Sequence, residues 1–348
     1  MNLIYTWEMS PPGASRLADT PTFPAAVFAV VLVAAVVATD GARATVPALQ
    51  GRVQDIAQAE RPLGDDHYLA GDIAGQVDHH VLYFGLDDVA SRHLQTADVL
   101  FLGNSRLMFA LRPEVLGPEF AALGLSYYAL GFGSREADRF PLAILRKFDL
   151  RPRVVVVNAD GFFIRWLSAW AEAVNRDTPF AARKLRLEAE ASHRARQALH
   201  VVAPHWLSIF GRPGLGQARG FNIYRSRIDG TWEISPWPSA TSTFAPPPAA
   251  GPAIGRGERA AALAFKAEMD RRGITLILTR VPTPEPHGGA GPARFAELLK
   301  VPLVLAEPPG LTSADHSHLD APSAFDWSRE FMAVLAPHLG GAGRAPVR

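Results

Sequence analysis

Short runs of apolar residues that do not alternate with polar ones recur along this chain, and they constrain its fold. Val99 to Leu102 is the first run, and Arg153-Val154-Val155-Val156-Val157-Asn158 is the clearest. Strands that are apolar on both faces are typical of a parallel sheet covered by helices on both sides. Similar patterns follow at 123–130, 274–279 and 302–306. The sequence therefore predicts a three-layer α/β/α sandwich around a mostly parallel sheet of about five strands.

A serine follows the first run at the point where open α/β sheets place their ligands. Gly103 and Asn104 can form a tight turn after the strand, and a helix is predicted over 107–115. Ser105 could be a nucleophile, with backbone N–H groups at the start of the helix stabilising an oxyanion. It could also be only the N-cap of that helix. A choice between these readings requires partner residues.

Candidate partners lie near the other end of the chain, in Asp315-His316-Ser317-His318. A nucleophilic serine needs a base within hydrogen-bond reach, and the base needs an orienting group. Asp315 would hold one ring nitrogen of His318, and the other nitrogen would accept the Ser105 proton. Asp315, His316 and His318 could instead bind a metal with further ligands from elsewhere. We favour the serine site and expect neither metal nor cofactor.

The two segments together resemble the SGNH/GDSL hydrolase superfamily. Gly103-Asn104-Ser105-Arg106 resembles its nucleophile block in the Gly-x-Ser-Arg variant, and Asp315 to His318 resembles its Asp-x-x-His block. Leu319 to Ser328 is similar to cell-envelope members, such as alginate O-acetylation and teichoic-acid D-alanylation proteins. The resemblance implies the SGNH (flavodoxin-like) fold and a serine esterase or O-acyltransferase of envelope or exported polysaccharide. Ser105, His318 and Asp315 would be its catalytic residues.

Two further blocks of the superfamily are matched less well. The resemblance implies that the backbone of Ser105 and a glycine after the second strand form the oxyanion hole, with Gly131 and Gly133 as candidates. An ordinary glycine turn is the alternative. The usual Gly-x-Asn-Asp block is absent, and Asn158 and Asp160 stand at its position. An aspartate facing an oxyanion repels it unless protonated or turned away. The departure leaves open a catalytically weak or inactive glycan-binding or assembly subunit.

The N-terminal region contains an apolar segment in which no residue from Thr20 to Thr39 is charged. About 20 such residues can span a bilayer as a helix. We expect a short tail over 1–19 and an uncleaved transmembrane signal anchor over 20–40. By the resemblance, the anchor lies in the inner (cytoplasmic) membrane and the main domain outside the cytoplasm. A buried helix is one alternative. A cleaved signal peptide is another, and it would favour a simple secreted esterase.

The rest of the chain divides into a juxtamembrane connector over 41–95, an SGNH-like domain over 96–338 with an insertion at 161–250, and a disordered tail over 339–348. The insertion is rich in aromatic residues, which could stack on sugars or contact a membrane. We favour simple packing of these aromatic residues. Asp78-His79-His80 in the connector has metal-capable side chains, and we favour a solvated or capping role.

The composition limits the partners. Lys and Arg number 35 against 34 Asp and Glu, which gives a formal net charge of +1. Without a basic stripe, this balance argues against nucleic acid as a main partner. The absence of cysteine excludes disulfides, thiolate catalysis and cysteine zinc sites. We expect the membrane, an acyl ester or polysaccharide substrate, and envelope proteins as partners.

Overall fold

The structure is a computed structural model. It describes residues 66–72, 75–76, 78–133, 136–165, 222–235, 242–245, 253–284 and 291–340, together with residue 240 and short pieces between 167 and 194. The predicted tail and membrane anchor, 1–40, lie outside the described residues. Within the described residues, no helix is both long and apolar enough to cross a membrane. Residues 339 and 340 end a helix rather than begin a disordered tail.

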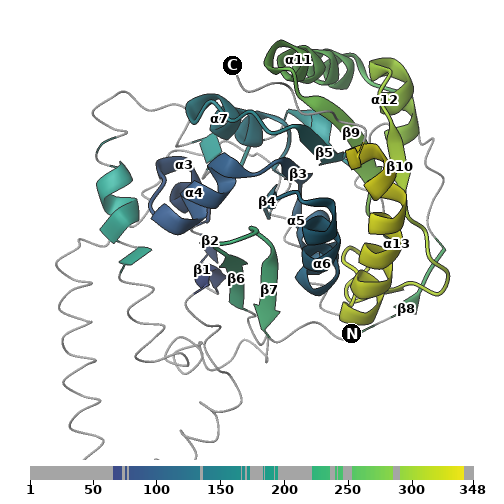
Figure 1. Ribbon diagram of the computed structural model, residues 1–348, viewed down its shortest axis with the longest axis horizontal. Coiled ribbons are helices and arrows are strands. Elements are labelled where there is room, and N and C mark those ends of the chain that lie inside the picture. Colours follow the sequence, from purple (N-terminus) through teal and green to yellow (C-terminus); the bar gives the residue numbers. More distant parts are fainter. Residues whose placement is uncertain are drawn as a thin grey trace, which may run out of the picture.

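Five strands form the central sheet, in the order β10–β9–β5–β3–β4 (Figure 1). Each of the four pairings between neighbours is parallel, which confirms the predicted parallel sheet. The second predicted strand begins later than expected, because Gly124 ends the preceding helix in a left-handed conformation. The strands are β3 (Val99–Gly103), β4 (Tyr127–Gly131), β5 (Val154–Asn158), β9 (Thr275–Arg280) and β10 (Leu303–Leu305).

Helices cover both faces of this sheet, because successive residues of a buried strand point to opposite sides. Val99 and Phe101 of β3 share one apolar cluster with α5 (Ser105–Ala110), α6 (Pro113–Leu123) and α13 (Ala321–Gly340). Leu100 and Leu102 share the other with α4 (Asp88–Thr96), α7 (Arg139–Lys147), α11 (Arg256–Arg272) and α12 (Pro292–Leu299). The three-layer arrangement follows from this alternation.

The helix predicted over 107–115 is in fact two helices. α5 ends at Ala110 and α6 begins at Pro113. Proline lacks a backbone N–H and is favoured at the first position of a helix, so it starts a new helix rather than continuing the old one. The break makes α5 a short helix that begins at Ser105 itself.

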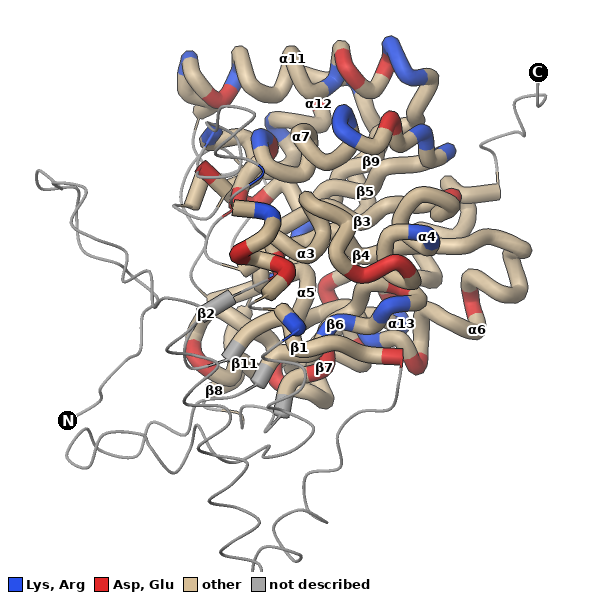
Figure 2. Tube along the Cα trace, turned by 90° about the vertical axis from the view of Figure 1, so that its left-hand side faces the viewer, with Lys and Arg blue, Asp and Glu red and all other residues tan. Residues whose placement is uncertain are grey.

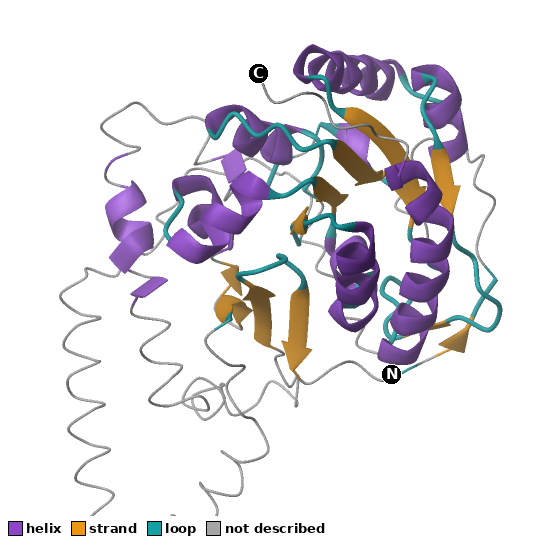
Figure 3. Cartoon of the chain, viewed as in Figure 1, coloured by secondary structure: helices purple, strands orange, loops and turns teal. Residues whose placement is uncertain are grey.

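A second, antiparallel sheet lies beside the central one (Figure 3). Its order is β2–β1–β6–β7. The first two strands come from the predicted connector, and β6 and β7 from the predicted insertion, where they form a ribbon around Asp229-Gly230. Tyr68 of β1 lies in the same apolar cluster as the central sheet, so this part of the connector packs into the domain. The strands are β1 (His67–Asp72), β2 (Gly75–Gln76), β6 (Asn222–Ser226) and β7 (Trp232–Ser235).

Helix α3 (Asp78–Phe84) corrects one prediction. Asp78, His79 and His80 are buried in it, so the predicted solvated role is wrong. Asp78 forms an ion pair with Arg225, and His79 Nε2 lies 3.1 Å from Glu136 Oε1. Among the described residues there is no group of three or more His, Cys, Asp or Glu side chains that could hold a metal ion. The remaining short elements are η1 (Phe162–Ile164), β8 (Ser242–Thr243) and β11 (Thr312–Ser313).

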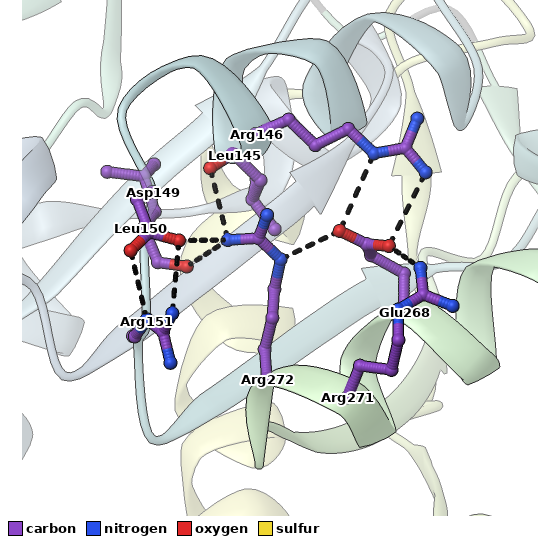
Figure 4. Close-up of polar contacts among 8 residues, drawn as sticks. All are labelled: Leu145, Arg146, Asp149, Leu150, Arg151, Glu268, Arg271 and Arg272. Carbon is purple, nitrogen blue, oxygen red and sulfur yellow. Dashed lines mark hydrogen bonds and ion pairs between the residues drawn. The ribbon is translucent and has the colours of Figure 1, made fainter.

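Charged residues of both signs are interspersed along the helices (Figure 2). One buried carboxylate, Glu268 of α11, joins α11 to α7 (Figure 4). Arg272 Nε donates to Glu268 at 2.8 Å, Arg146 Nη2 donates at 3.4 Å, and Arg271 also pairs with it. Arg272 Nη1 also donates a hydrogen bond to the carbonyl of Leu150 at 3.1 Å. These contacts tie together the ends of two helices that cover the same face of the sheet.

Candidate active site

Ser105 is the first residue of α5, at the carboxyl end of β3. Asn104 rather than Ser105 caps this helix, because the Asn104 Oδ1 accepts a hydrogen bond from the backbone N–H of Arg106 at 3.1 Å. The Ser105 hydroxyl is therefore not needed as the cap. Its Oγ lies 2.8 Å from His318 Nε2, which brings together residues from opposite ends of the domain.

His318 and Asp315 are held by a tight loop before α13. His318 Nδ1 lies 2.8 Å from Asp315 Oδ2. The other carboxylate oxygen accepts hydrogen bonds from the backbone N–H groups of Ser317, at 3.0 Å, and of His318, at 2.7 Å. His316, between them, has a φ of 65°, the left-handed conformation that the sharp loop requires. The His316 side chain is exposed.

Asp315 is ionised in this loop. Partial burial opposes its charge, but the hydrogen bonds and charge of His318 and the backbone N–H of Ser317 outweigh burial and lower the pKa of Asp315 to about 2. A carboxylate that is ionised at neutral pH accepts a hydrogen bond from the Nδ1–H group. This leaves Nε2 with its lone pair toward the Ser105 hydroxyl, which is the tautomer that a general base requires.

The imidazole of His318 is also held from its face. The ring of Phe109, four residues after Ser105 on α5, stacks on it with centroids 4.3 Å apart and planes at 29°. Behind Phe109 lies Trp232 of β7, with ring centroids 6.3 Å apart. The second sheet therefore contributes to the packing around the histidine.

Arg106 connects the two loops of the site. It is buried, and its Nε donates to Ser317 Oγ at 3.2 Å. Its Nη1 forms an ion pair with Asp160. One side chain thus links the nucleophile turn, the Asp315–His318 loop and the end of β5. The carboxylate of Asp160 is turned toward Arg106, which relieves the repulsion that an unpaired aspartate would exert on an oxyanion.

Asn158, the last residue of β5, supports the turn before Ser105. It is fully buried, its Nδ2 donates to Asn104 Oδ1 at 3.2 Å, and its Oδ1 accepts from the backbone N–H of Val281 at 3.3 Å. Asn104 Nδ2 in turn donates to the carbonyl of Asp160 at 3.3 Å. The Asn158 amide thus links the turn before Ser105 to the backbone just after β9.

The two candidate glycines stand at the last position of β4, Gly131, and two residues further on, Gly133. The N–H of Phe132 donates to the carbonyl of Gly103 at 3.1 Å, toward β3. Because neighbouring residues of an extended strand point their N–H groups to opposite sides, the N–H of Gly131 points away from β3 and Ser105. Gly133 lies buried in the bend beyond the strand. Of the two candidates, Gly131 therefore does not direct its N–H toward Ser105.

Sequence reasoning missed Phe109, Trp232 and Ser317 as neighbours of the site. The spacing of Phe109 carried a signal, because a residue four positions after Ser105 lies on the same face of a helix. For Trp232 there was no local signal, since its strand reaches the site only through the second sheet.

Comparisons with family models and with curated proteins find no match for this chain. Among solved structures, it is similar to a protein named as an acylhydrolase from Bacteroides fragilis, at 14% identity and a TM-score of 0.32, over 72% of this chain and 93% of that one. It is also similar to a GDSL-like lipase from Bacteroides thetaiotaomicron, at 12% identity and a TM-score of 0.33, over 75% of this chain and 100% of that one. At TM-scores this low, conclusions about activity rest on the chain's own residues.

Proposed function

We propose that this protein is a serine-dependent acyl-ester hydrolase or O-acyltransferase. One observation carries the proposal: the continuous line of contacts from Ser105 Oγ to His318 Nε2, at 2.8 Å, and from His318 Nδ1 to Asp315 Oδ2, at 2.8 Å. A residue that only caps a helix, or a protein that only binds a ligand, has no need of a base and an orienting carboxylate in this order.

In the first step, Ser105 Oγ attacks the carbonyl carbon of an ester while His318 Nε2 takes the hydroxyl proton. Asp315 stabilises the imidazolium that forms. The negative charge that develops on the carbonyl oxygen is stabilised by the backbone N–H of Ser105, which has no acceptor within its own helix. The N–H of Gly133 is the second donor. Collapse of the tetrahedral intermediate releases the alcohol, which takes the proton from His318.

In the second step, the acyl-Ser105 intermediate passes its acyl group to water or to another hydroxyl. His318 removes the proton from that nucleophile, and the resulting tetrahedral intermediate releases Ser105 with its proton restored. Water as the nucleophile gives a hydrolase, and a sugar hydroxyl gives an O-acyltransferase. The same three side chains serve both outcomes.

The proposed substrate class is an acyl ester on an envelope or exported polysaccharide. The apolar segment over 20–40, proposed as an inner-membrane anchor with the domain on the outer side, supports this choice. The departure at Asn158 and Asp160 from the usual third block supports the transferase branch. Envelope proteins that deliver the acyl donor are the proposed partners.

The second candidate is a catalytically weak glycan-binding or assembly subunit of the same fold. The pairing of Asp160 with Arg106 favours it, because a carboxylate cannot donate to an oxyanion and the Asn158 amide already binds Asn104 and Val281. It differs from the first candidate in one measurable property, which is whether Ser105 is a reactive nucleophile.

A fluorophosphonate probe tests the proposal on membranes that contain the full chain. Wild type is expected to be labelled, and Ser105→Ala and His318→Ala to lose the label. Ser323→Ala is a matched control, since Ser323 is a buried serine on α13 that binds the backbone of Thr312 rather than a histidine. Wild-type protein that is folded and unlabelled would overturn the enzyme proposal in favour of the binding subunit.

A further inference from the structure

Arg225 of β6 is fully buried, and it lies far from Ser105 in the sequence but next to the strand that leads into the proposed oxyanion turn. Its guanidinium pairs with Asp78 of α3, with Nη2 to Oδ2 at 2.6 Å and Nε to both carboxylate oxygens at 3.0 Å. Tyr68 adds a hydrogen bond to Asp78 at 2.6 Å. Asp78, held by Tyr68, therefore fixes the position of the Arg225 guanidinium.

The same guanidinium holds the end of β4. Its Nη1 donates to the carbonyls of Ala129 and of Gly230, the latter at 2.7 Å, and its Nη2 donates to the carbonyl of Gly131. The ring of Phe132 lies 5.6 Å from the guanidinium carbon. Arg225 thus contacts Ala129, Gly131 and Phe132, at the point where the strand becomes the turn.

These contacts set the direction of one peptide group. The Gly131 carbonyl points toward Arg225, and the N–H of the same peptide unit, which belongs to Phe132, points the other way to Gly103 at 3.1 Å. Hydrogen bonds at both its oxygen and its nitrogen hold this peptide group in one orientation. The backbone enters the turn at Gly133 from this oriented peptide group.

We propose that Arg225 is a positioning residue that, together with Asp78, holds the turn after β4 in the shape that presents a backbone N–H to the oxyanion. This inference rests on the proposed function. Both residues lie outside the segments that resemble the hydrolase superfamily: Asp78 comes from the predicted connector and Arg225 from the predicted insertion. The second sheet would then be part of the catalytic apparatus rather than an appendage.

The test replaces the pair with apolar residues of similar length, as Asp78→Leu with Arg225→Met. Removing both charges together avoids an unpaired buried charge, and such exchanges are often neutral for stability. We expect kcat for 4-nitrophenyl acetate, counted per fluorophosphonate-labelled site, to fall about 10- to 100-fold, because one misplaced oxyanion donor costs about that much or more. KM is expected to stay within about twofold. A purely structural role would lower the number of labelled sites and leave kcat per site unchanged.

Arg225→Lys is a second variant for the case in which the double variant does not fold. It keeps a charge opposite Asp78, but one ammonium cannot bind a carboxylate and two carbonyls in the fork geometry of arginine. The matched control is Arg227→Met with Asp87→Asn, an ion pair between the turn after β6 and the N-cap of α4. Arg227 also donates to the carbonyl of His67 in β1, which is not part of β4. The control is expected to keep its kcat.

The outcomes separate the two proposals. If wild type is labelled at Ser105 but the Arg225 variants keep the wild-type kcat per site, the positioning role is overturned and the enzyme proposal stands. If wild type itself is neither labelled nor active, both are overturned. If the control variant loses as much kcat as the Arg225 variants, the effect belongs to the sheet in general and the specific role of Arg225 is overturned.

Discussion

Asp315 orients His318 while remaining about half exposed, with 47% of its side chain accessible. Asp315→Asn is expected to lower kcat about 10³- to 10⁴-fold, because an amide can donate to Nδ1 and select the wrong tautomer. The fall in kcat is measured by steady-state ester hydrolysis at pH 6 and pH 8. Asp326→Asn, an exposed aspartate that pairs with Arg329, is the control and should retain full activity. A loss below tenfold would contradict the role given to Asp315.

The pKa of Asp315 also predicts a pH dependence. Because the pKa of about 2 lies below the ordinary value of 3.8, the carboxylate stabilises the folded state above about pH 4, and this stabilisation is lost as the pH falls toward 2. Urea unfolding between pH 4 and pH 2 should therefore show a smaller loss of stability in Asp315→Asn than in wild type.

Phe109 is expected to act through the orientation of His318. Phe109→Leu keeps an apolar side chain but removes the stacked ring, and aromatic pairs contribute about 0.5–1.5 kcal/mol beyond their buried area. We expect kcat to fall about 2- to 10-fold with KM unchanged. Phe120→Leu is the matched control, because Phe120 is buried in the same apolar cluster and packs on Phe101 and Tyr127 rather than on His318. Equal kcat in the two variants would count against the stacking role.

Asp138 is the N-cap residue of helix α7, and burial disfavours the charged form of its carboxyl group. Burial raises the pKa of Asp138 to about 6, although Arg165 opposes the rise. The folded state therefore holds a proton that the unfolded chain releases between pH 4 and pH 6, and ionisation of Asp138 costs stability as the pH rises through that window. The difference between the ordinary pKa of 3.8 and the pKa of about 6 corresponds to about 3 kcal/mol of folding free energy.

Asp138→Asn removes this titration. Relative to wild type, its free energy of unfolding should rise by about 2–3 kcal/mol between pH 4 and pH 7.5. Urea unfolding at the two pH values measures the difference. Asp270→Asn on the exposed side of α11, where Asp270 pairs with Lys266, provides the comparison and should show no such rise. A difference between variant and wild type that does not change with pH would rule out this account of Asp138.

The two sheets meet where the ribbon turn of β6 and β7 docks on β4. The backbone N–H of Ala129 donates to the carbonyl of Asp229 at 2.7 Å. Gly230 has a φ of +72°, and a Cβ there would lie 2.5 Å from the Tyr128 ring and 2.6 Å from the Ala129 carbonyl. No side chain fits between the ribbon and the central sheet at this point.

Gly230→Ala is therefore expected to destabilise the whole domain by about 2–4 kcal/mol, from backbone strain and from overpacking. Gly273→Ala is its control, since Gly273 has nearly the same φ, +68°, with nothing within 4 Å of the added Cβ. It should cost only about 1 kcal/mol. Equal costs in urea unfolding would mean that the ribbon does not pack against β4 as described.

The central sheet could be predicted because its information is local. Four consecutive valines at 154–157 bury both faces of a strand whatever surrounds them. Two features of the site are likewise local in the sequence. Ser105 follows its strand and tight turn directly, and Asp315 and His318 are three residues apart. The pairing of Ser105 with His318 could be proposed from residue types, because a nucleophile requires a base.

The tertiary structure alone decided how these parts are held. The partners of Arg225 come from α3, β4 and the ribbon turn, and no pattern within any one of these segments specifies the others. The carboxylate of Asp160 pairs with Arg106, which comes from the first turn of α5. Local sequence determines the strands and the tight turns, since side-chain periodicity and backbone conformation act over a few positions. Which buried charge meets which carbonyl depends on the packing of distant segments, and only the folded chain brings those segments together.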